Sequence, residues 1–67
     1  MAILKVIEIL SSSEKSWEDA TAKGVAKASK TIKNIKSAFV QSQSVTVEAG
    51  KVKEYRVNLK LSFEVLD

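Results

Sequence analysis

The sequence predicts a small α+β domain whose elements follow the order β-α-β-β. Three observations support this fold class: an N-terminal stretch rich in β-branched residues, a central stretch with apolar residues at helical spacing, and a C-terminal stretch that alternates between apolar and polar residues. With 67 residues the chain has room for one hydrophobic core, so we expect residues 1–67 to form a single domain.

The first strand is expected over Ile3 to Leu10. Apolar residues occupy both alternation faces of this stretch, which is typical of a short strand that is covered on each side. The run from Ser11 to Lys15 breaks the pattern and is expected to end the strand.

A helix is expected to begin near Trp17, which we interpret as a core anchor or an interface residue. Ser16 followed by Asp19 resembles a capping box, with aspartate in place of the preferred glutamate. A helix of about 18 residues then accounts for the apolar and small residues at helical spacing. These are Trp17, Ala20, Thr21, Gly24, Val25, Ala28, Ile32 and Ile35. Gly24 indicates a close approach to the sheet, because a mid-helix glycine costs about 1 kcal/mol relative to alanine.

The last two strands are expected to form a long antiparallel hairpin. Strand-like sequence follows Ile35, and Glu48 to Lys51 resembles a tight turn in which Gly50 takes the position with positive φ. From Val52 onward the residues alternate between two faces. One face carries Tyr55, Val57, Leu59, Leu61, Phe63 and Val65, and the other carries Glu54, Arg56, Asn58, Lys60, Ser62 and Glu64. Because one helix covers one face only, the second face is expected to meet solvent, a partner or a ligand.

The chain contains no cysteine and no histidine. A lone core in a domain of this size supplies about 3 to 5 kcal/mol of stability. Since disulfides and the usual structural metal sites are excluded, subunit association is the expected source of additional stability. A chain without cysteine also fits a reducing, cytoplasmic environment.

The charge pattern predicts neither nucleic-acid nor membrane partners. Eleven basic and eight acidic residues give a net charge of +3, and every basic residue except Arg56 is a lysine scattered among carboxylates. A nucleic-acid-binding protein more often shows arginine clusters with interleaved aromatic residues. The N-terminal apolar run is interrupted by charges and is far shorter than the roughly 20 apolar residues of a membrane span.

Enzymatic activity is not expected. Without histidine, the serine and cysteine triads are excluded, and the chain shows neither a convergent set of acids nor a phosphate-binding glycine loop. Four acids could supply part of a calcium site, but no spacing matches a calcium loop, and surface or capping roles explain them. They are Glu14, Asp19, Glu54 and Glu64. Arg56 is expected either to pair with an acid of its own or a neighbouring strand, or to contact a ligand.

Several motifs together resemble dodecins. They are Lys5-Val6-Ile7-Glu8, Ser16-Trp17-Glu18-Asp19-Ala20, Lys30-Thr31-Ile32, Glu48-Ala49-Gly50, Glu54-Tyr55-Arg56-Val57 and Ser62-Phe63. The resemblance covers nearly the whole chain. It implies a three-stranded antiparallel sheet partly wrapped around one helix, and a hollow homododecamer. Many dodecins bind flavin between subunits.

Two positions depart from the flavin-binding dodecins. Those proteins stack a tryptophan on the isoalloxazine where this chain has Ser37, and many contact the flavin with a glutamine where it has Arg56. Loss of an aromatic stack removes roughly 0.5 to 1.5 kcal/mol beyond the lost area, so binding of FMN or riboflavin is expected to be weak or absent. The chain resembles the subgroup without this tryptophan, which is described as calcium-binding. The resemblance assigns no metal ligands.

We therefore expect a homododecameric shell that binds a small molecule or an ion, with Ser37 and Arg56 facing the pocket that the family uses. The alternative is a calcium-binding or a purely structural or interaction module that takes no flavin.

Overall fold

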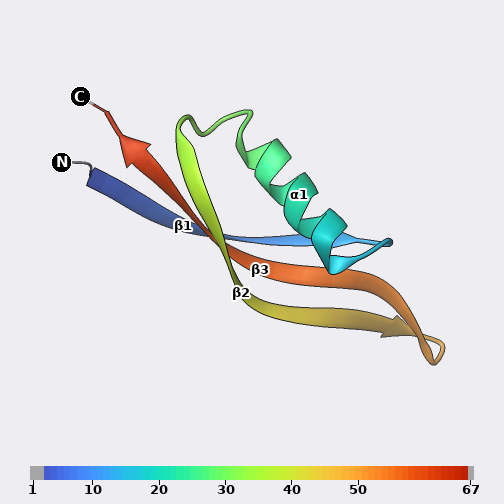
Figure 1. Ribbon diagram of the computed structural model, residues 1–67. Coiled ribbons are helices and arrows are strands. Elements are labelled where there is room, and N and C mark those ends of the chain that lie inside the picture. Colours follow the sequence, from blue (N-terminus) through green and yellow to red (C-terminus); the bar gives the residue numbers. More distant parts are fainter. Residues whose placement is uncertain (1–2, 67) are drawn as a thin grey trace.

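The computed structural model describes residues 3–66 and confirms the predicted α+β fold. The elements are β1 (Ile3–Ser13), α1 (Trp17–Ala28), β2 (Ile35–Glu48) and β3 (Lys51–Val65). The strands form one antiparallel sheet in the order β1-β3-β2, so the C-terminal strand lies in the middle. α1 lies over one face of the twisted sheet and leaves the other face uncovered (Figure 1).

The core lies between α1 and the middle strand. The strict alternation of β3 places Val57, Leu59 and Leu61 beneath the helix, where each is 0% exposed, as is Ala20 of α1. Gly24 permits this close packing, because a Cβ atom there would lie 3.0 Å from the Ser11 Cβ and 3.2 Å from the Leu59 Cδ1. The close helix approach predicted from Gly24 is therefore confirmed.

The start of α1 follows the sequence prediction, but only half of the capping box forms. Ser16 is the N-cap, and its hydroxyl accepts a hydrogen bond from the Asp19 N–H at 2.9 Å. The Asp19 carboxylate instead accepts a hydrogen bond from the Ser13 hydroxyl at 2.5 Å and lies 3.1 Å from the Lys23 ammonium. Asp19 thereby ties the first turn of the helix to the end of β1.

This arrangement predicts a pH-dependent contribution to stability. The hydrogen bond from Ser13, and then the Lys23 ammonium, lower the pKa of Asp19 below its ordinary value of 3.8. A carboxyl whose pKa is lower in the folded state stabilises that state above the unfolded pKa, and this contribution is lost as pH falls through the folded pKa. We expect Asp19→Asn to lower the urea midpoint at neutral pH, and the difference from the parent to shrink near pH 3.

Glu18→Gln is the matched control, because Glu18 is an exposed acid in the same helical turn. It is expected to change the urea midpoint little at either pH. A difference between Asp19→Asn and the parent that stays the same at both pH values would contradict this role of the Asp19 charge.

The helix is shorter than predicted. α1 spans 12 residues and not about 18, and Ile35 belongs to β2 instead of the helix. After α1 the chain turns, and Asn34 adopts a positive φ of 64°. The Asn34 carbonyl then accepts a hydrogen bond from the Glu64 N–H at 3.0 Å, and Ile35 pairs with Phe63. Sheet pairing with β3 therefore replaces further helical turns. Among residues 3–66, no helix is long and apolar enough to cross a membrane.

β1 is longer than predicted, because the serine run is part of the strand. Ser11 to Ser13 pair with β3, from Val57 to Tyr55. The Ser11 hydroxyl donates to the Ala20 carbonyl at 2.7 Å, and the Ser13 hydroxyl donates to Asp19. Serine is a weak strand former, so these bonds to α1 explain why a sequence typical of a turn forms a strand here.

Two further expectations need correction. Both central residues of the β2–β3 turn have positive φ, 53° at Ala49 and 77° at Gly50, although only Gly50 was expected to adopt it. This pattern fits the tight turn that matches the twist of a two-residue hairpin. The predicted cover on both faces of β1 is also not present within one chain, since Leu4, Val6 and Leu10 are exposed.

Candidate functional site

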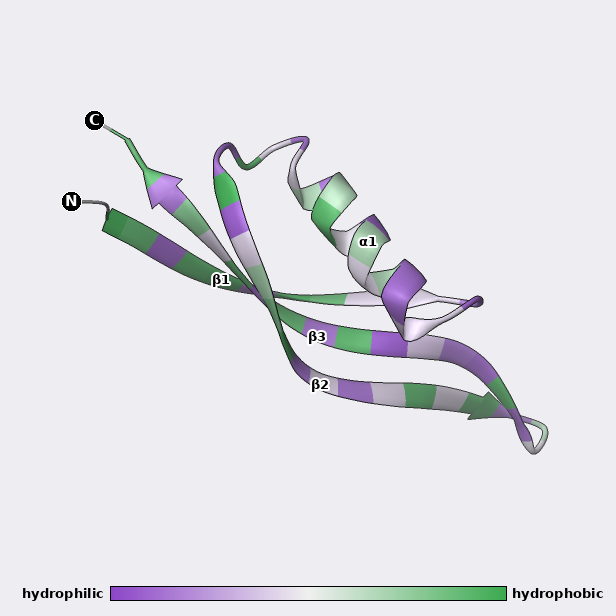
Figure 2. Cartoon of the chain, viewed as in Figure 1, coloured by the Kyte–Doolittle hydropathy of each residue, from purple (hydrophilic) through white to green (hydrophobic). Residues whose placement is uncertain are grey.

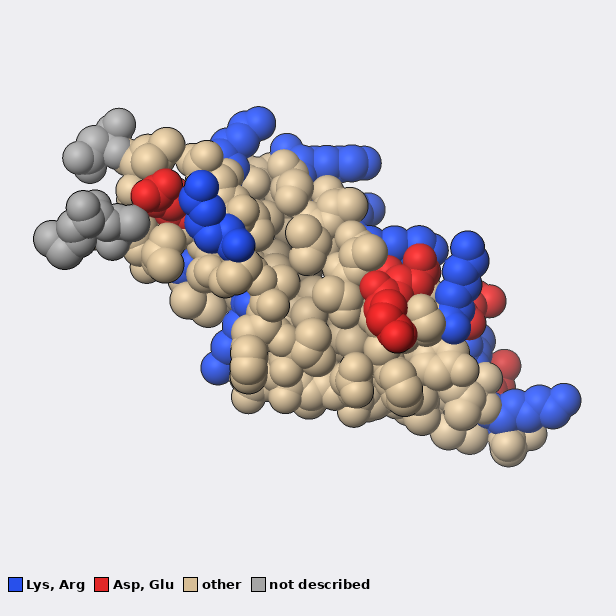
Figure 3. Space-filling model, in the orientation of Figure 1, with Lys and Arg blue, Asp and Glu red and all other residues tan. Residues whose placement is uncertain are grey.

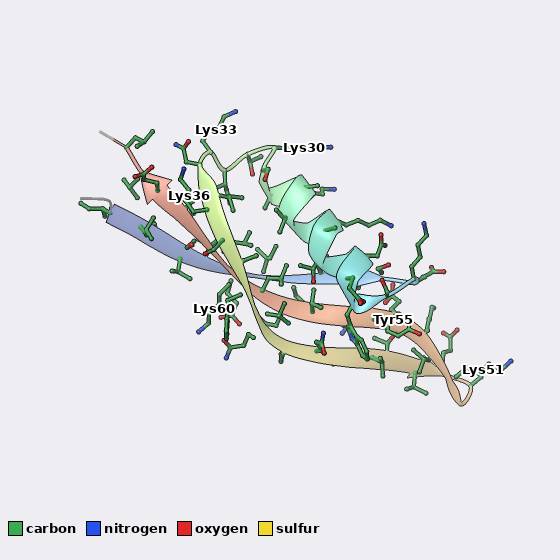
Figure 4. All side chains as sticks on the ribbon, viewed as in Figure 1. Lys30, Lys33, Lys36, Lys51, Tyr55 and Lys60 are labelled. Atoms are coloured by element: carbon green, nitrogen blue, oxygen red, sulfur yellow. The ribbon has the colours of Figure 1, made fainter. Side chains whose placement is uncertain are left out.

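The sheet face opposite α1, called the open face below, is the candidate site. Residues that pair directly across strands point to the same face, so the register identifies its members. They are Leu4, Val6, Glu8, Leu10 and Ser12 of β1, Ser37, Phe39, Ser42, Ser44 and Thr46 of β2, and Glu54, Arg56, Asn58, Lys60, Ser62 and Glu64 of β3. Figure 4 shows the Lys60 side chain directed away from α1. The prediction that β3 presents a polar face away from the helix is confirmed.

Two β-bulges determine which side chains of β2 reach the open face. The pairing with β3 shifts between Ile35 and Ser37 and again between Val40 and Ser42. Each shift adds one residue and reverses the alternation of the strand. As a result Ile35 faces the helix while Ser37 lies on the open face, and Ser44 lies on the same face as Ser37.

Ser37 lies near the start of β2, opposite Ser62. Their hydroxyl groups are hydrogen-bonded to one another. The position that the resemblance matches to the stacking tryptophan of flavin-binding dodecins therefore carries a small polar pair in this chain. Phe39 lies on the same face two residues further along β2 and is 63% exposed, yet the sequence analysis did not single it out. Its place on the open face depends on the first bulge, which the alternation pattern did not reveal.

Arg56 lies in the middle strand with a serine on each side, Ser12 of β1 and Ser44 of β2. Its side chain is exposed, and within residues 3–66 it makes no ion pair. The expected pairing with Glu54 or Glu64 is not observed in the single chain, where Glu64 lies 4.0 Å from Lys36 instead.

The two predicted ligand residues share a face but do not meet within one chain. Ser37 pairs with Ser62, which is six positions from Arg56 along β3. At about 3.3 Å per residue, this separates them by about 20 Å. Their role in ligand binding stays a prediction, and a pocket that uses both would combine residues from different copies.

Trp17 of α1 holds the backbone of β2 at Ser44, next to Arg56. Its indole Nε1 donates a hydrogen bond to the Ser44 carbonyl at 3.0 Å, and its ring meets that of Tyr55 edge to face with centroids 5.2 Å apart. Tyr55 lies beside the start of α1 in Figure 4. Trp17 therefore connects α1 to both β2 and β3, in agreement with its interpretation as an anchor.

Replacing Trp17 with phenylalanine tests this connection. The variant keeps an aromatic ring but loses the N–H donor, so we expect the free energy of unfolding to fall by about 0.5 to 1.5 kcal/mol. Urea denaturation followed by far-UV circular dichroism measures the change. Trp17→Leu, which also loses the edge-to-face contact with Tyr55, is expected to be less stable again. Equal stability of Trp17→Phe and the parent would show that the bond to Ser44 contributes nothing.

The sequence placed Asn58 on this face but gave it no role, and it did not place Ser12, Ser42 or Ser44 there. Asn58 lies between Leu10 and Ser42, and its Oδ1 atom is buried without a hydrogen-bond partner. The sequence could have placed Ser12 on the open face, because Ser12 lies two residues after Leu10 and continues the alternation of β1. Within residues 3–66, no group of three or more acidic side chains is placed to hold a metal ion.

A groove of about 350 Å³ lies between α1 and the edge strand β1. Its lining residues are Ile9, Leu10, Ser11, Ser12, Lys23, Gly24, Lys27 and Ala28. The groove reaches Leu10 and Ser12 at the β1 edge of the open face, but neither Ser37 nor Arg56 lines it.

Comparison with known proteins identifies relatives along the whole described chain. The family model for dodecin matches residues 3–66. The calcium dodecin of Mycobacterium tuberculosis is 39% identical over 66 residues, covering 97% of this chain and 92% of that protein. The crystal structure of calcium dodecin from the same organism, described as calcium-chelating with a novel calcium-binding site, has a TM-score of 0.84 at 37% identity, covering 96% and 91% of the two chains.

Other dodecin structures share the fold at lower identity. An arginine-to-alanine mutant of Thermus thermophilus dodecin has a TM-score of 0.93 at 28% identity and covers 100% of both chains. The dodecin from Streptomyces coelicolor has a TM-score of 0.94 at 26% identity, with 98% of this chain and 94% of that chain covered.

Proposed function

Because the chain belongs to the dodecin family, we propose that it acts as a ligand-binding shell of twelve identical copies and not as an enzyme. The observation that carries this proposal is the surface of the single chain. It exposes 4999 Å², whereas a compact monomer of this mass exposes about 4,200 Å². Its radius of gyration is 13.7 Å, against about 11 Å for a compact chain of this length.

Much of this surface is apolar. Within residues 3–66, eleven large hydrophobic side chains are exposed, among them Leu10 at 64% and Phe39 at 63%. Figure 2 shows hydrophobic residues concentrated along the first half of β1. On the face shown in Figure 3, charged side chains lie mainly at the periphery, and a broad expanse between them carries no charge. Exposed apolar surface of this extent is typical of subunit interfaces.

Light scattering on the purified protein at micromolar concentration tests the assembly. Twelve copies of 7.3 kDa predict a mass of about 88 kDa. Val6→Glu places a charge on an exposed apolar position of the open face and is expected to give smaller species. Ala26→Glu, at an exposed position of α1, is the control and is expected to leave the mass unchanged. A parent protein that is monomeric or dimeric would overturn the proposal.

We further propose that the open face lines the ligand pocket, and that the cargo is an ion such as calcium rather than a stacked flavin. The pair of hydroxyl groups at Ser37 and Ser62 argues against a stacked flavin, because it offers no aromatic surface for an isoalloxazine ring. The similarity to the calcium-chelating M. tuberculosis dodecin supports calcium as the cargo. A single chain does not fit calcium alone, since Ca²⁺ takes six to eight oxygen ligands and residues 3–66 hold no cluster of three acids. Such a site would therefore share ligands between copies.

Two titrations of the intact oligomer distinguish these cargoes. Calorimetry with calcium is expected to show saturable binding, and fluorescence titration with FMN and riboflavin is expected to show no quenching at micromolar protein. Flavin quenching with micromolar affinity would mean that another group, such as Phe39, replaces the missing stack. An intact shell that binds neither calcium nor flavin would favour the purely structural or interaction role.

A further inference from the structure

We infer that Arg56, Ser12 and Ser44 form an oxyanion site that takes the phosphate group of a small phosphorylated ligand. This inference rests on the proposal that the open face lines the ligand pocket, and it adds a second ligand, an anion, beside the proposed cation. The strand register, the free hydrogen-bond donors and the local charge each support it.

The register places the three side chains in one row across the sheet. Arg56 of the middle strand pairs directly with Ser12 on one side and with Ser44 on the other. Side chains that are directly opposite in an antiparallel pair have Cβ atoms about 4.5 to 5.5 Å apart. The three side chains therefore start from adjacent positions on the same face, within reach of one bound group.

The two hydroxyl groups are free to bind a ligand. In the serine run of β1, Ser11 and Ser13 face the helix and donate to Ala20 and Asp19, while Ser12 faces the opposite way. Neither the Ser12 nor the Ser44 hydroxyl makes a hydrogen bond within residues 3–66, although the Ser44 backbone is held by the Trp17 indole at 3.0 Å. The backbone is thus fixed and the donors remain available.

Local charge favours an anion at this row. Arg56 forms no ion pair within residues 3–66, and Glu64, which was expected as a partner, lies eight positions away along β3 and 4.0 Å from Lys36. Glu54, two residues along β3, is the nearest open-face acid and leaves Arg56 unpaired. A guanidinium group binds phosphate through two parallel N–H bonds, which a lysine ammonium cannot reproduce.

The next row adds a group that recognises more than the phosphate. Asn58 lies there between Leu10 and Ser42, and its buried Oδ1 atom has no partner. Because this oxygen is covered by the protein, a ligand hydroxyl close to the phosphate would reach the Asn58 amide only after the side chain rotates, and the amide then offers both an acceptor and a donor. The site therefore fits a phosphorylated polyol or sugar better than inorganic phosphate.

Calorimetric titration of the intact oligomer with ribose 5-phosphate, inorganic phosphate and ribose tests the site. We expect affinity to fall in that order, with no measurable binding of ribose. Arg56→Gln is expected to weaken binding of ribose 5-phosphate roughly tenfold to a hundredfold, and Arg56→Lys to restore only part of the loss. The Ser12→Ala, Ser44→Ala double variant is expected to weaken binding without a change in charge.

Lys51→Gln is the matched control, because it removes one exposed positive charge at the distant β2–β3 turn. It is expected to bind as the parent does. Equal affinities of the parent and Arg56→Gln, an equal loss in Lys51→Gln, or no binding of either phosphate would overturn the inference. Light scattering on the same samples separates two failures: an intact dodecamer that binds no phosphate overturns this site alone, whereas a smaller species overturns the proposed shell.

Discussion

Replacing Leu59 with alanine is expected to unfold the subunit. Leu59 is one of two fully buried leucines among residues 3–66, at 0% exposure, and it packs under α1 close to Gly24. Truncation of a buried leucine costs about 2 to 5 kcal/mol, because it removes apolar contacts and leaves a cavity. A core of this size supplies only about 3 to 5 kcal/mol, so the loss consumes most of the stability of one copy. Far-UV circular dichroism and light scattering measure secondary structure and assembly together.

Leu66→Ala is the control for this variant. Leu66 is 65% exposed, so the same change of side chain removes little buried contact there. We expect this control to keep its circular dichroism spectrum. A Leu59→Ala protein that remains folded and assembled, with an unfolding free energy within about 1 kcal/mol of the parent, would show that the subunit interfaces rather than this core dominate stability.

The double variant Ser37→Trp, Arg56→Gln is expected to gain flavin binding. It restores both residues that the flavin-binding dodecins are described as using at these positions. The stack contributes roughly 0.5 to 1.5 kcal/mol beyond the apolar area that the indole covers, and that area adds about 25 cal/mol per Å². Riboflavin affinity should therefore rise roughly tenfold or more over the parent. Quenching of flavin fluorescence by the intact oligomer measures the gain.

Two controls separate the pocket from a general effect of tryptophan. Ser37→Ala removes the hydroxyl pair with Ser62 and adds no aromatic surface, so it should not quench. Ser29→Trp places the indole at the exposed C-terminal end of α1, away from the open face, and should not quench either. No quenching by a double variant that still forms the full assembly would show that Ser37 does not border a flavin pocket.

The same substitutions also test the proposed phosphate site, through the preference for FMN over riboflavin. With Arg56 present, FMN has a phosphate that riboflavin lacks, and the guanidinium can discriminate between them. We therefore expect Ser37→Trp alone to favour FMN over riboflavin, and the addition of Arg56→Gln to remove this preference. Equal preference in both backgrounds would place the flavin phosphate away from Arg56.

Much of the fold could be predicted because local signals agreed with the final packing. The alternation from Tyr55 to Val65 predicted a strand with one buried face, and the structure buries Val57, Leu59 and Leu61 on that face. Ser16 predicted the helix start, because a serine hydroxyl that accepts a backbone N–H bond needs only the next helical turn as a partner. Gly24 predicted close packing, because a mid-helix glycine is costly unless space demands it.

Local signals failed where a distant strand decided the outcome. Ile32 and Ile35 fit a helical stripe, yet the helix ends at Ala28 and Ile35 pairs with Phe63. The serine run resembles a turn, yet it pairs with β3 as a strand, and the Ser11 and Ser13 hydroxyl groups bind α1. Both segments also pair with β3, which lies far away in the sequence, so a short-range pattern cannot contain the energy of that pairing.

The sequence by itself determined the order of elements, the helix start, the buried face of β3 and the family to which the chain belongs. These depend on side-chain periodicity, on one cap and on motifs, all of which are local. Only the tertiary structure decided the contents of the open face. The two bulges in β2 reverse its alternation against β3, and they bring Ser37 and Ser44 to the side that carries Arg56. A bulge depends on the pairing of two strands, so neither strand's own sequence specifies which of its side chains share a face.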